Sequence, residues 1–235
     1  MKAIGKDIGD ALDVMHKEIE NRLRTETGRL LWLQPFEGGS FSNVEWRQEA
    51  VVIQLHNGVP THALPHVLGV ALQHVRQRMD LYPGVIAPDQ DLEGGPLLRT
   101  ALRELVMGPE AEMHLEPLNL DTEWESEQRH QGLKEMLRDA PSEWDISGMA
   151  GNSFAALQYA RFSLEHPSEL WESLKEQFEA KLPTAAEKGE QVVTVVQQSG
   201  WKTPGACLQS LVSAREALNL QPYATVEDRQ KSRKL

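Results

Sequence analysis

The sequence predicts a mainly α fold with a small β element, an α+β protein, on three observations. Apolar residues recur every three or four positions over most of the 235-residue chain, as they do in amphipathic helices. Only Ala50–Leu55 has the density of β-branched residues that is typical of a strand. Hydrophobic residues make up 40% of the chain and charged residues 25%, so a core of ordinary size forms without disulfides or metal ions.

The first predicted element is one long amphipathic helix, from about Ile8 to Leu31. Its apolar positions follow helical spacing, and its other side carries charged residues that suit a solvated face. The strand Ala50–Leu55 follows. Because a single strand cannot satisfy its own backbone groups, it must pair, and the candidate partners are Gly39–Val44 and Val85–Ala87.

The rest of the chain predicts a series of helices. Pro65 suits the first helical position, where a missing N–H costs nothing. Gly108 and Pro109 are expected to end a later helix, and a short acidic turn, Glu110–Leu115, follows them. The predicted helices are Pro65–Leu81, Pro96–Met107, Asp121–Arg138, Ser153–Glu165, Ser168–Lys181, Thr184–Ser199 and Thr203–Leu218.

The sequence predicts three regions along the chain. Residues 1–140 form an N-terminal α+β part that contains the histidine-bearing helix, and residues 141–224 form a C-terminal helical part. The connection Pro141–Gly151, with its glycines, is the predicted boundary between them. Residues 225–235 carry several Arg and Lys and are predicted to be a flexible, solvated tail rather than an arm that binds nucleic acid.

Charge and cysteine content narrow the class of protein. The chain has 24 Lys+Arg and 35 Asp+Glu, a formal net charge of −11, which disfavours nucleic-acid binding because affinity for phosphates depends on clustered basic residues. No apolar run is long enough for a membrane span, and the N-terminal residues lack the pattern of a signal peptide. The one cysteine, Cys207, is predicted to be buried. We therefore expect a soluble cytoplasmic protein, with its oligomeric state and its partner left open.

The most informative feature is a stretch of 26 residues, Ala50–Val75, that contains no Asp, Glu, Lys or Arg. In a chain that is one quarter charged, such a gap predicts that the strand and the first half of the next helix lie in the core. Four of the eight histidines lie in the same stretch, and buried imidazoles need hydrogen-bond partners. These histidines are His56, His62, His66 and His74.

Helix geometry limits which of these histidines could share a metal ion. His66 and His74 are eight residues apart, about 12 Å along a helix, which is too far for one zinc ion. His62 and His66 are four residues apart, although the predicted helix start leaves His62 in the preceding loop. One hypothesis is a zinc site made of His62, His66 and a glutamate, either Glu104 or Glu112. The alternative is that these histidines are only hydrogen-bonded structural residues.

Three acidic residues at the start of the predicted Asp121–Arg138 helix also invite a catalytic interpretation. Glu123, Glu125 and Glu127 alternate along the chain, but a spacing of two points side chains to different faces of a helix. Acidic residues in a first turn also complement the helix dipole. Most of them, and of the similarly spaced pair Glu110 and Glu112, are therefore predicted to be solvated surface charges.

The segment His66-Val67-Leu68-Gly69-Val70-Ala71-Leu72-Gln73-His74 resembles the active-site helix of zincin metallopeptidases. The family pattern is H-E-L-G-H, followed by L-L-L-H in one large branch. His66 matches the first zinc histidine and His74 the downstream histidine of that branch. Val67 stands where the family has its general-base glutamate, and Val70 where it has the second zinc histidine. The resemblance, over about nine residues, implies a zincin-like fold that has lost its peptidase chemistry and whose pocket serves binding or scaffolding.

Three functional hypotheses follow from these observations. The first is a non-catalytic binding or regulatory protein, with no catalytic residues and no assigned cofactor. The second is a metal-dependent hydrolase that uses His62, His66 and a glutamate. The third is a helical interaction module that oligomerises through the Ile8–Leu31 helix.

Overall fold

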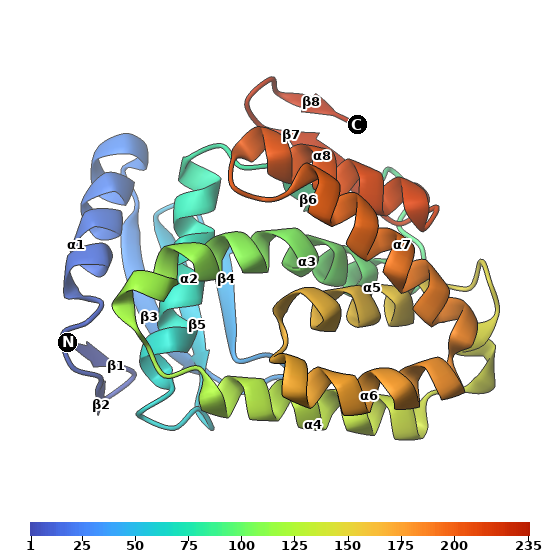
Figure 1. Cartoon of the computed structure of the whole chain (residues 1–235). Coiled ribbons are helices and arrows are strands. Elements are labelled where there is room, and N and C mark those ends of the chain that lie inside the picture. Colours follow the sequence, from blue (N-terminus) through green and yellow to red (C-terminus); the bar gives the residue numbers. More distant parts are fainter. The chain divides into compact units, whose positions relative to one another are not determined.

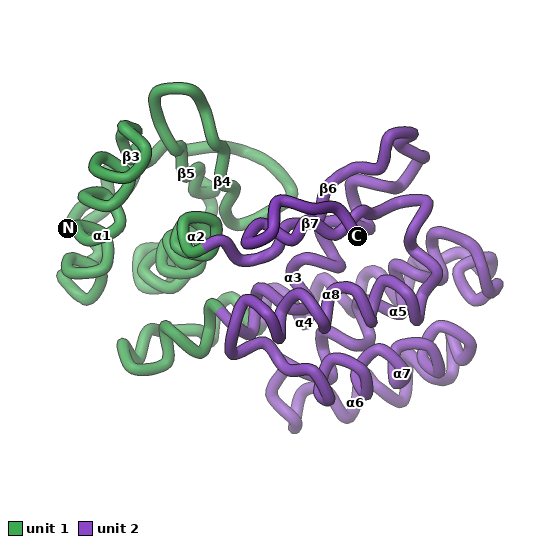
Figure 2. Tube along the Cα trace, turned by 90° about the horizontal axis from the view of Figure 1, so that it is seen from above, with its two compact units in different colours: residues 1–80, 111–126 green, residues 81–110, 127–235 purple.

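The computed structural model describes all 235 residues and contains eight α-helices and three small sheets, which confirms the mainly α, α+β prediction. None of the helices combines the length and apolar character needed to cross a membrane. The chain divides into two compact units (Figure 2). Unit 1 contains Met1–Asp80 and Ala111–Ser126, and unit 2 contains Leu81–Glu110 and Glu127–Leu235. This division does not coincide with the predicted one at Pro141–Gly151.

A three-stranded sheet forms one side of unit 1 (Figure 1). Its strands are β3 (Leu30–Phe36), β4 (Ser42–Trp46) and β5 (Ala50–His56), and β5 lies in the middle. It pairs parallel to β3 and antiparallel to β4. The predicted strand is therefore confirmed. Of its predicted partners, Gly39–Val44 overlaps β4, whereas Val85–Ala87 pairs elsewhere.

The N-terminal helix is shorter than predicted. Helix α1 spans Asp13–Arg22 and continues as a π-helical segment, Leu23–Thr27. Gly28, at φ +71°, ends it in a left-handed conformation that glycine adopts without steric cost, and the next residues enter β3. Two short strands, β1 (Lys2–Ala3) and β2 (Lys6–Asp7), pair before α1, and the helix begins at Asp13 rather than at the predicted Ile8.

The uncharged stretch forms the centre of unit 1, as predicted. Helix α2 (Leu64–Met79) begins with Pro65 in its first turn and contacts β4, β5 and α1. Its apolar side chains and those of β5 make one buried cluster, which also includes Ile19 of α1 and Leu23 of the π-helical segment that follows. The cluster from α2 and β5 includes Val51, Ile53, Leu55, Leu64, Val67, Leu68, Ala71, Leu72 and Val75.

Helix α3 (Gly95–Leu115) passes through the predicted stop at the Gly-Pro pair, and the predicted acidic turn after it is helical. Pro109 lies inside the helix, where its ring and its missing N–H cost about 3 kcal/mol. Leu105 before it and Leu115 after it are buried, and each such burial contributes about 1.5–3 kcal/mol. Burial on both sides of the proline therefore outweighs its local cost.

The remaining helices follow the predictions closely. Thr203, a predicted start signal, accepts a hydrogen bond from the backbone N–H of Ala206 at 3.2 Å. These helices pack around two apolar clusters, and Cys207 is buried in one of them, as predicted. The helices are α4 (Glu123–Asp139), α5 (Ala150–Glu165), α6 (Ser168–Lys181), α7 (Pro183–Ser199) and α8 (Pro204–Ala217).

Residues 225–235 are not the flexible tail that the sequence predicts. They form β7 (Thr225–Asp228) and β8 (Arg233–Lys234), which make a sheet with β6 (Gly84–Ile86). Val226 is fully buried, and Arg233 pairs with Asp228 at 2.9 Å. Strand pairing with β6 and the buried side chains of Val226 and Asp228 hold the segment in place, and Arg233 and Lys234 of β8 are exposed.

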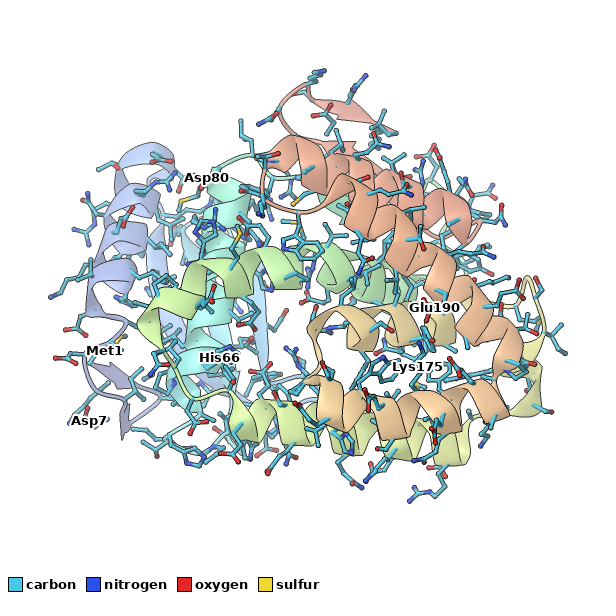
Figure 3. The ribbon with its side chains drawn as sticks, viewed as in Figure 1. Met1, Asp7, His66, Asp80, Lys175 and Glu190 are labelled. Atoms are coloured by element: carbon cyan, nitrogen blue, oxygen red, sulfur yellow. The ribbon has the colours of Figure 1, made fainter.

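Close packing of α5 against α7 depends on Gly189. A Cβ at this position would lie 2.5 Å from Cδ1 of Tyr159. Tyr159 is itself fixed, because its ring packs against Trp171 and Phe178 and its hydroxyl donates to Glu190 at 2.6 Å. Glu190 also pairs with a lysine of α6, Lys175, at 2.9 Å (Figure 3).

Replacing Gly189 with alanine is expected to lower the free energy of unfolding of unit 2 by about 1–3 kcal/mol, the usual cost of overpacking a core. Gly132→Ala in α4 is the matched control, since a Cβ there meets nothing within 4 Å. That change should stabilise by up to about 1 kcal/mol through helix propensity. Urea unfolding measures both, and equal effects of the two variants would contradict the packing account.

Candidate functional site

His66 is the one histidine of the uncharged stretch that lies in the interior. It sits near the start of α2 (Figure 3) and is 3% exposed. Pro65 restricts the backbone at the helix start, and the neighbouring Val67 and Leu68 are buried in the unit 1 cluster. The helix start and the packing of its neighbours therefore hold the imidazole in place.

Two carboxylates meet the two ring nitrogens of His66. Nδ1 lies 2.8 Å from Oε2 of Glu125, and Nε2 lies 2.9 Å from Oε2 of Glu112. Glu112 belongs to the part of α3 that lies in unit 1, and Glu125 to the first turn of α4. The side chain of Glu125 is 7% exposed and that of Glu112 is 35% exposed, so the cluster is closed on one side and reaches solvent on the other.

The charge of His66 follows from these contacts. Burial by itself would lower its pKa, but the hydrogen bonds to Glu112 and Glu125 outweigh burial and raise the pKa to about 9. The ring is therefore a cation at neutral pH, and both of its N–H groups donate to carboxylates. Such charge-assisted hydrogen bonds are shorter and stronger than neutral ones.

Apolar contacts place the two glutamates opposite α2. At Gly69, a Cβ would meet Cδ2 of Leu115 at 3.0 Å, so the absence of a side chain at this position lets α2 pack closely against the 111–126 segment. Trp124, next to Glu125, packs against Phe41 with ring centroids 5.1 Å apart. These contacts anchor both ends of the segment that carries the carboxylates.

The residues of the predicted zinc site have different surroundings. His62 is exposed in the turn before α2. Glu104 lies in unit 2 and pairs with Arg103 at 2.7 Å, whereas His66 lies in unit 1. Glu112, the other glutamate considered, contacts His66. No three or more His, Cys, Asp or Glu side chains are grouped as a metal ion would require. A zinc site of His62, His66 and Glu104 stays a prediction.

The other two histidines of the stretch make local contacts. Nδ1 of His56 accepts a hydrogen bond from the backbone N–H of Gly58 at 3.0 Å. His74 lies on the flank of α2, as expected, with Nδ1 2.8 Å from Oε1 of Gln77. The stretch is buried, but it brings only one imidazole into the core.

The prediction that Glu125 is a solvated surface charge is wrong. The carboxylate is buried beside Trp124, in the first turn of α4, because this tryptophan packs into unit 1 and its neighbour lies inward with it. That tryptophan, in the first turn of a helix that otherwise starts with acidic residues, is the sequence signal that could have identified Glu125 as a buried residue.

The cluster has a limited chemical capacity. An imidazolium that donates from both nitrogens has no lone pair for a metal ion and cannot accept a proton. Val67 is 2% exposed in the core at the position that matches the zincin general base. Unit 1 therefore holds a fixed, charged hydrogen-bonded cluster.

Comparison of this chain with protein-family models, curated proteins and solved structures found no match.

Proposed function

We propose that this chain is a non-catalytic binding or regulatory protein of the cytoplasm, in which α2 keeps the form of a zincin-like helix without its chemistry. One observation carries the proposal: both ring nitrogens of the buried His66 are hydrogen-bonded to carboxylates. In a hydrolytic zinc site, the corresponding histidine offers a nitrogen lone pair to the metal. The cytoplasmic setting is supported by the single, buried cysteine, Cys207.

An exposed edge strand supports the binding part of the proposal. Strand β3 lies at the edge of its sheet, and its side chains Leu30 and Trp32 are 43% and 42% exposed. Edge strands present backbone groups that can pair with an added strand, and large exposed apolar side chains supply the contacts that stabilise such pairing. A partner protein that adds an extended segment here is the kind of ligand that unit 1 suits.

The two other hypotheses have less support. Oligomerisation through the N-terminal helix would need a free apolar face, but Ile19 and Leu23 are buried within unit 1. The hydrolase hypothesis needs His66 to be neutral and to bind a metal ion.

Metal analysis distinguishes a non-catalytic binding protein from a metal-dependent hydrolase. Tag-free protein purified without chelators is expected to carry no stoichiometric zinc at His66, and a mixed peptide library is expected to stay intact after prolonged incubation with it. The matched control is His66→Gln, which keeps hydrogen-bond donors toward the carboxylates. Its zinc content should equal that of the unmodified protein.

The hydrolase hypothesis makes the opposite prediction. One zinc ion per chain that is lost in His66→Gln, together with peptide cleavage that is lost in the same variant, would overturn the proposed function.

A further inference from the structure

A second pair of histidines lies in unit 2, apart from the His66 cluster. His130 belongs to α4, and His166 directly follows the last residue of α5. Nδ1 of His130 and Nε2 of His166 are 3.2 Å apart, and the two ring planes differ by only 14°. Neither residue figures in the zinc hypothesis, and the two are 36 positions apart in the chain.

Both rings are held by their surroundings. The His166 ring packs against Phe162, with centroids 4.9 Å apart, and its backbone N–H donates to the Phe162 carbonyl at 3.0 Å. Arg129 of α4 pairs with Glu165 of α5 at 3.1 Å, and each of these two residues directly precedes one of the histidines in the chain. The ion pair and the ring contact therefore fix the part of the chain that carries each imidazole.

The histidines are neutral at pH 7. Burial lowers the pKa of His130, with a further contribution from Lys134. Burial, followed by His130 and Arg129, lowers the pKa of His166 to about 4. Arg129 and Lys134 also oppose an added cation, but the pairing of Arg129 with Glu165 partly neutralises the first of these charges. Two neutral imidazoles can each present a lone pair without first losing a proton.

The distance between the two nitrogens suits a shared metal ion. Ligand nitrogens bonded to one ion at about 2.1 Å, with angles between roughly 90° and 110°, lie roughly 3.0–3.4 Å apart. We propose that His130 and His166 form a two-imidazole site for a divalent transition-metal ion, with water in the remaining coordination positions. Without metal, one N–H donates to the facing nitrogen. With metal, that proton moves to the outer nitrogen of the same ring, and both rings turn their lone pairs toward the ion.

The chemistry of the ligands defines the class of ion. Imidazole nitrogen suits Zn²⁺, Ni²⁺ and Cu²⁺, whereas Mg²⁺ and Ca²⁺ prefer oxygen ligands. Both side chains are only partly buried, so solvent reaches the pair. With two protein ligands in place of the four of a structural zinc site, the ion should exchange readily. This site goes beyond the proposed function, since it does not involve His66.

Calorimetric titration of the tag-free, chelator-stripped full chain with Zn²⁺ tests the proposal. We expect one ion per chain, with NMR shifts at the rings of His130 and His166. His130→Gln and His166→Gln should each weaken binding by at least about 10–100-fold, the loss that follows removal of even an outer-shell partner. Glutamine keeps a hydrogen bond to the facing ring but has no nitrogen lone pair for the metal. The double variant should bind at least as weakly as either single variant, since it keeps neither imidazole.

His62→Gln is the matched control, because His62 is exposed and lies in unit 1. It should bind Zn²⁺ as the unmodified protein does. Unchanged affinity in both His130→Gln and His166→Gln, or no binding by the unmodified chain, would overturn the proposed site. Zinc binding that is lost only in His66→Gln would overturn the proposed function and this site together, whereas loss only in the pair variants leaves the proposed function intact.

Discussion

Replacing His66 with alanine is expected to lower the free energy of unfolding of unit 1 by about 3–5 kcal/mol, the cost of removing one member of a buried ion pair. The change removes a cation that donates to Glu125 at 2.8 Å and to Glu112 at 2.9 Å. The carboxylate of Glu125 would keep its burial and lose this charge partner. The expected loss is therefore larger than that of an average core hydrogen bond.

Hydrogen exchange at the amides of α2 measures the loss of stability in His66→Ala within unit 1, and urea unfolding measures the loss for the whole chain. His62→Ala is the control, since this exposed side chain should change stability by no more than about 0.5 kcal/mol. A loss below about 1 kcal/mol in His66→Ala would mean that the cluster is not a stabilising ion pair.

Raising the pH from 6 to 10 is expected to lower the free energy of unfolding of unit 1 by roughly 3 kcal/mol. The pKa of His66 is raised from 6.5 to about 9 in the folded protein, where burial alone would lower it but Glu112 and Glu125 raise it. The stabilisation is therefore fully present below pH 6.5 and is lost as the pH rises through 9. A shift of this size corresponds to roughly 3 kcal/mol at about 1.4 kcal/mol for each pH unit.

Urea unfolding between pH 6 and pH 10 measures this dependence. His66→Gln is the matched variant, because an amide donates hydrogen bonds but does not titrate in this range. The difference in stability between the two proteins should shrink as the pH rises from 6.5 to 9. A difference that stays constant, or one that grows with pH, would contradict a raised pKa.

Much of the helical part of the fold could be predicted because its signals are local. The predicted Ser168–Lys181 helix coincides with α6, where Pro167 precedes the helix and Lys181 ends it. Thr203 caps α8 as its residue type suggests. The errors occur where distant packing overrides local preference, as at Pro109 in α3.

The sheets were harder to predict than the helices. Strand β3 pairs parallel to β5, and the sequence between them says nothing about that pairing. Its first residues continue the apolar spacing of the preceding helix, so the prediction extended that helix to Leu31. The C-terminal strands have a basic composition that suits a tail, and Val226 is their one buried apolar residue.

The candidate site could be predicted in part. The absence of charge over Ala50–Val75 located His66 in the interior, and Glu112 was one of the glutamates considered beside it. The third member, Glu125, is 59 residues from His66 in the chain. Its burial depends on how the 111–126 segment packs in unit 1, which no local spacing encodes.

The protonation of His66 is the most direct test of this account. A titration of the imidazole ¹⁵N and ¹³C resonances of His66 should give a pKa near 9, with both ring nitrogens protonated at pH 7. His62, exposed before α2, provides an internal comparison in the same spectra. A neutral His66 ring at pH 7, with one nitrogen free of hydrogen, would contradict the closed ion cluster and leave that nitrogen available for a metal ion.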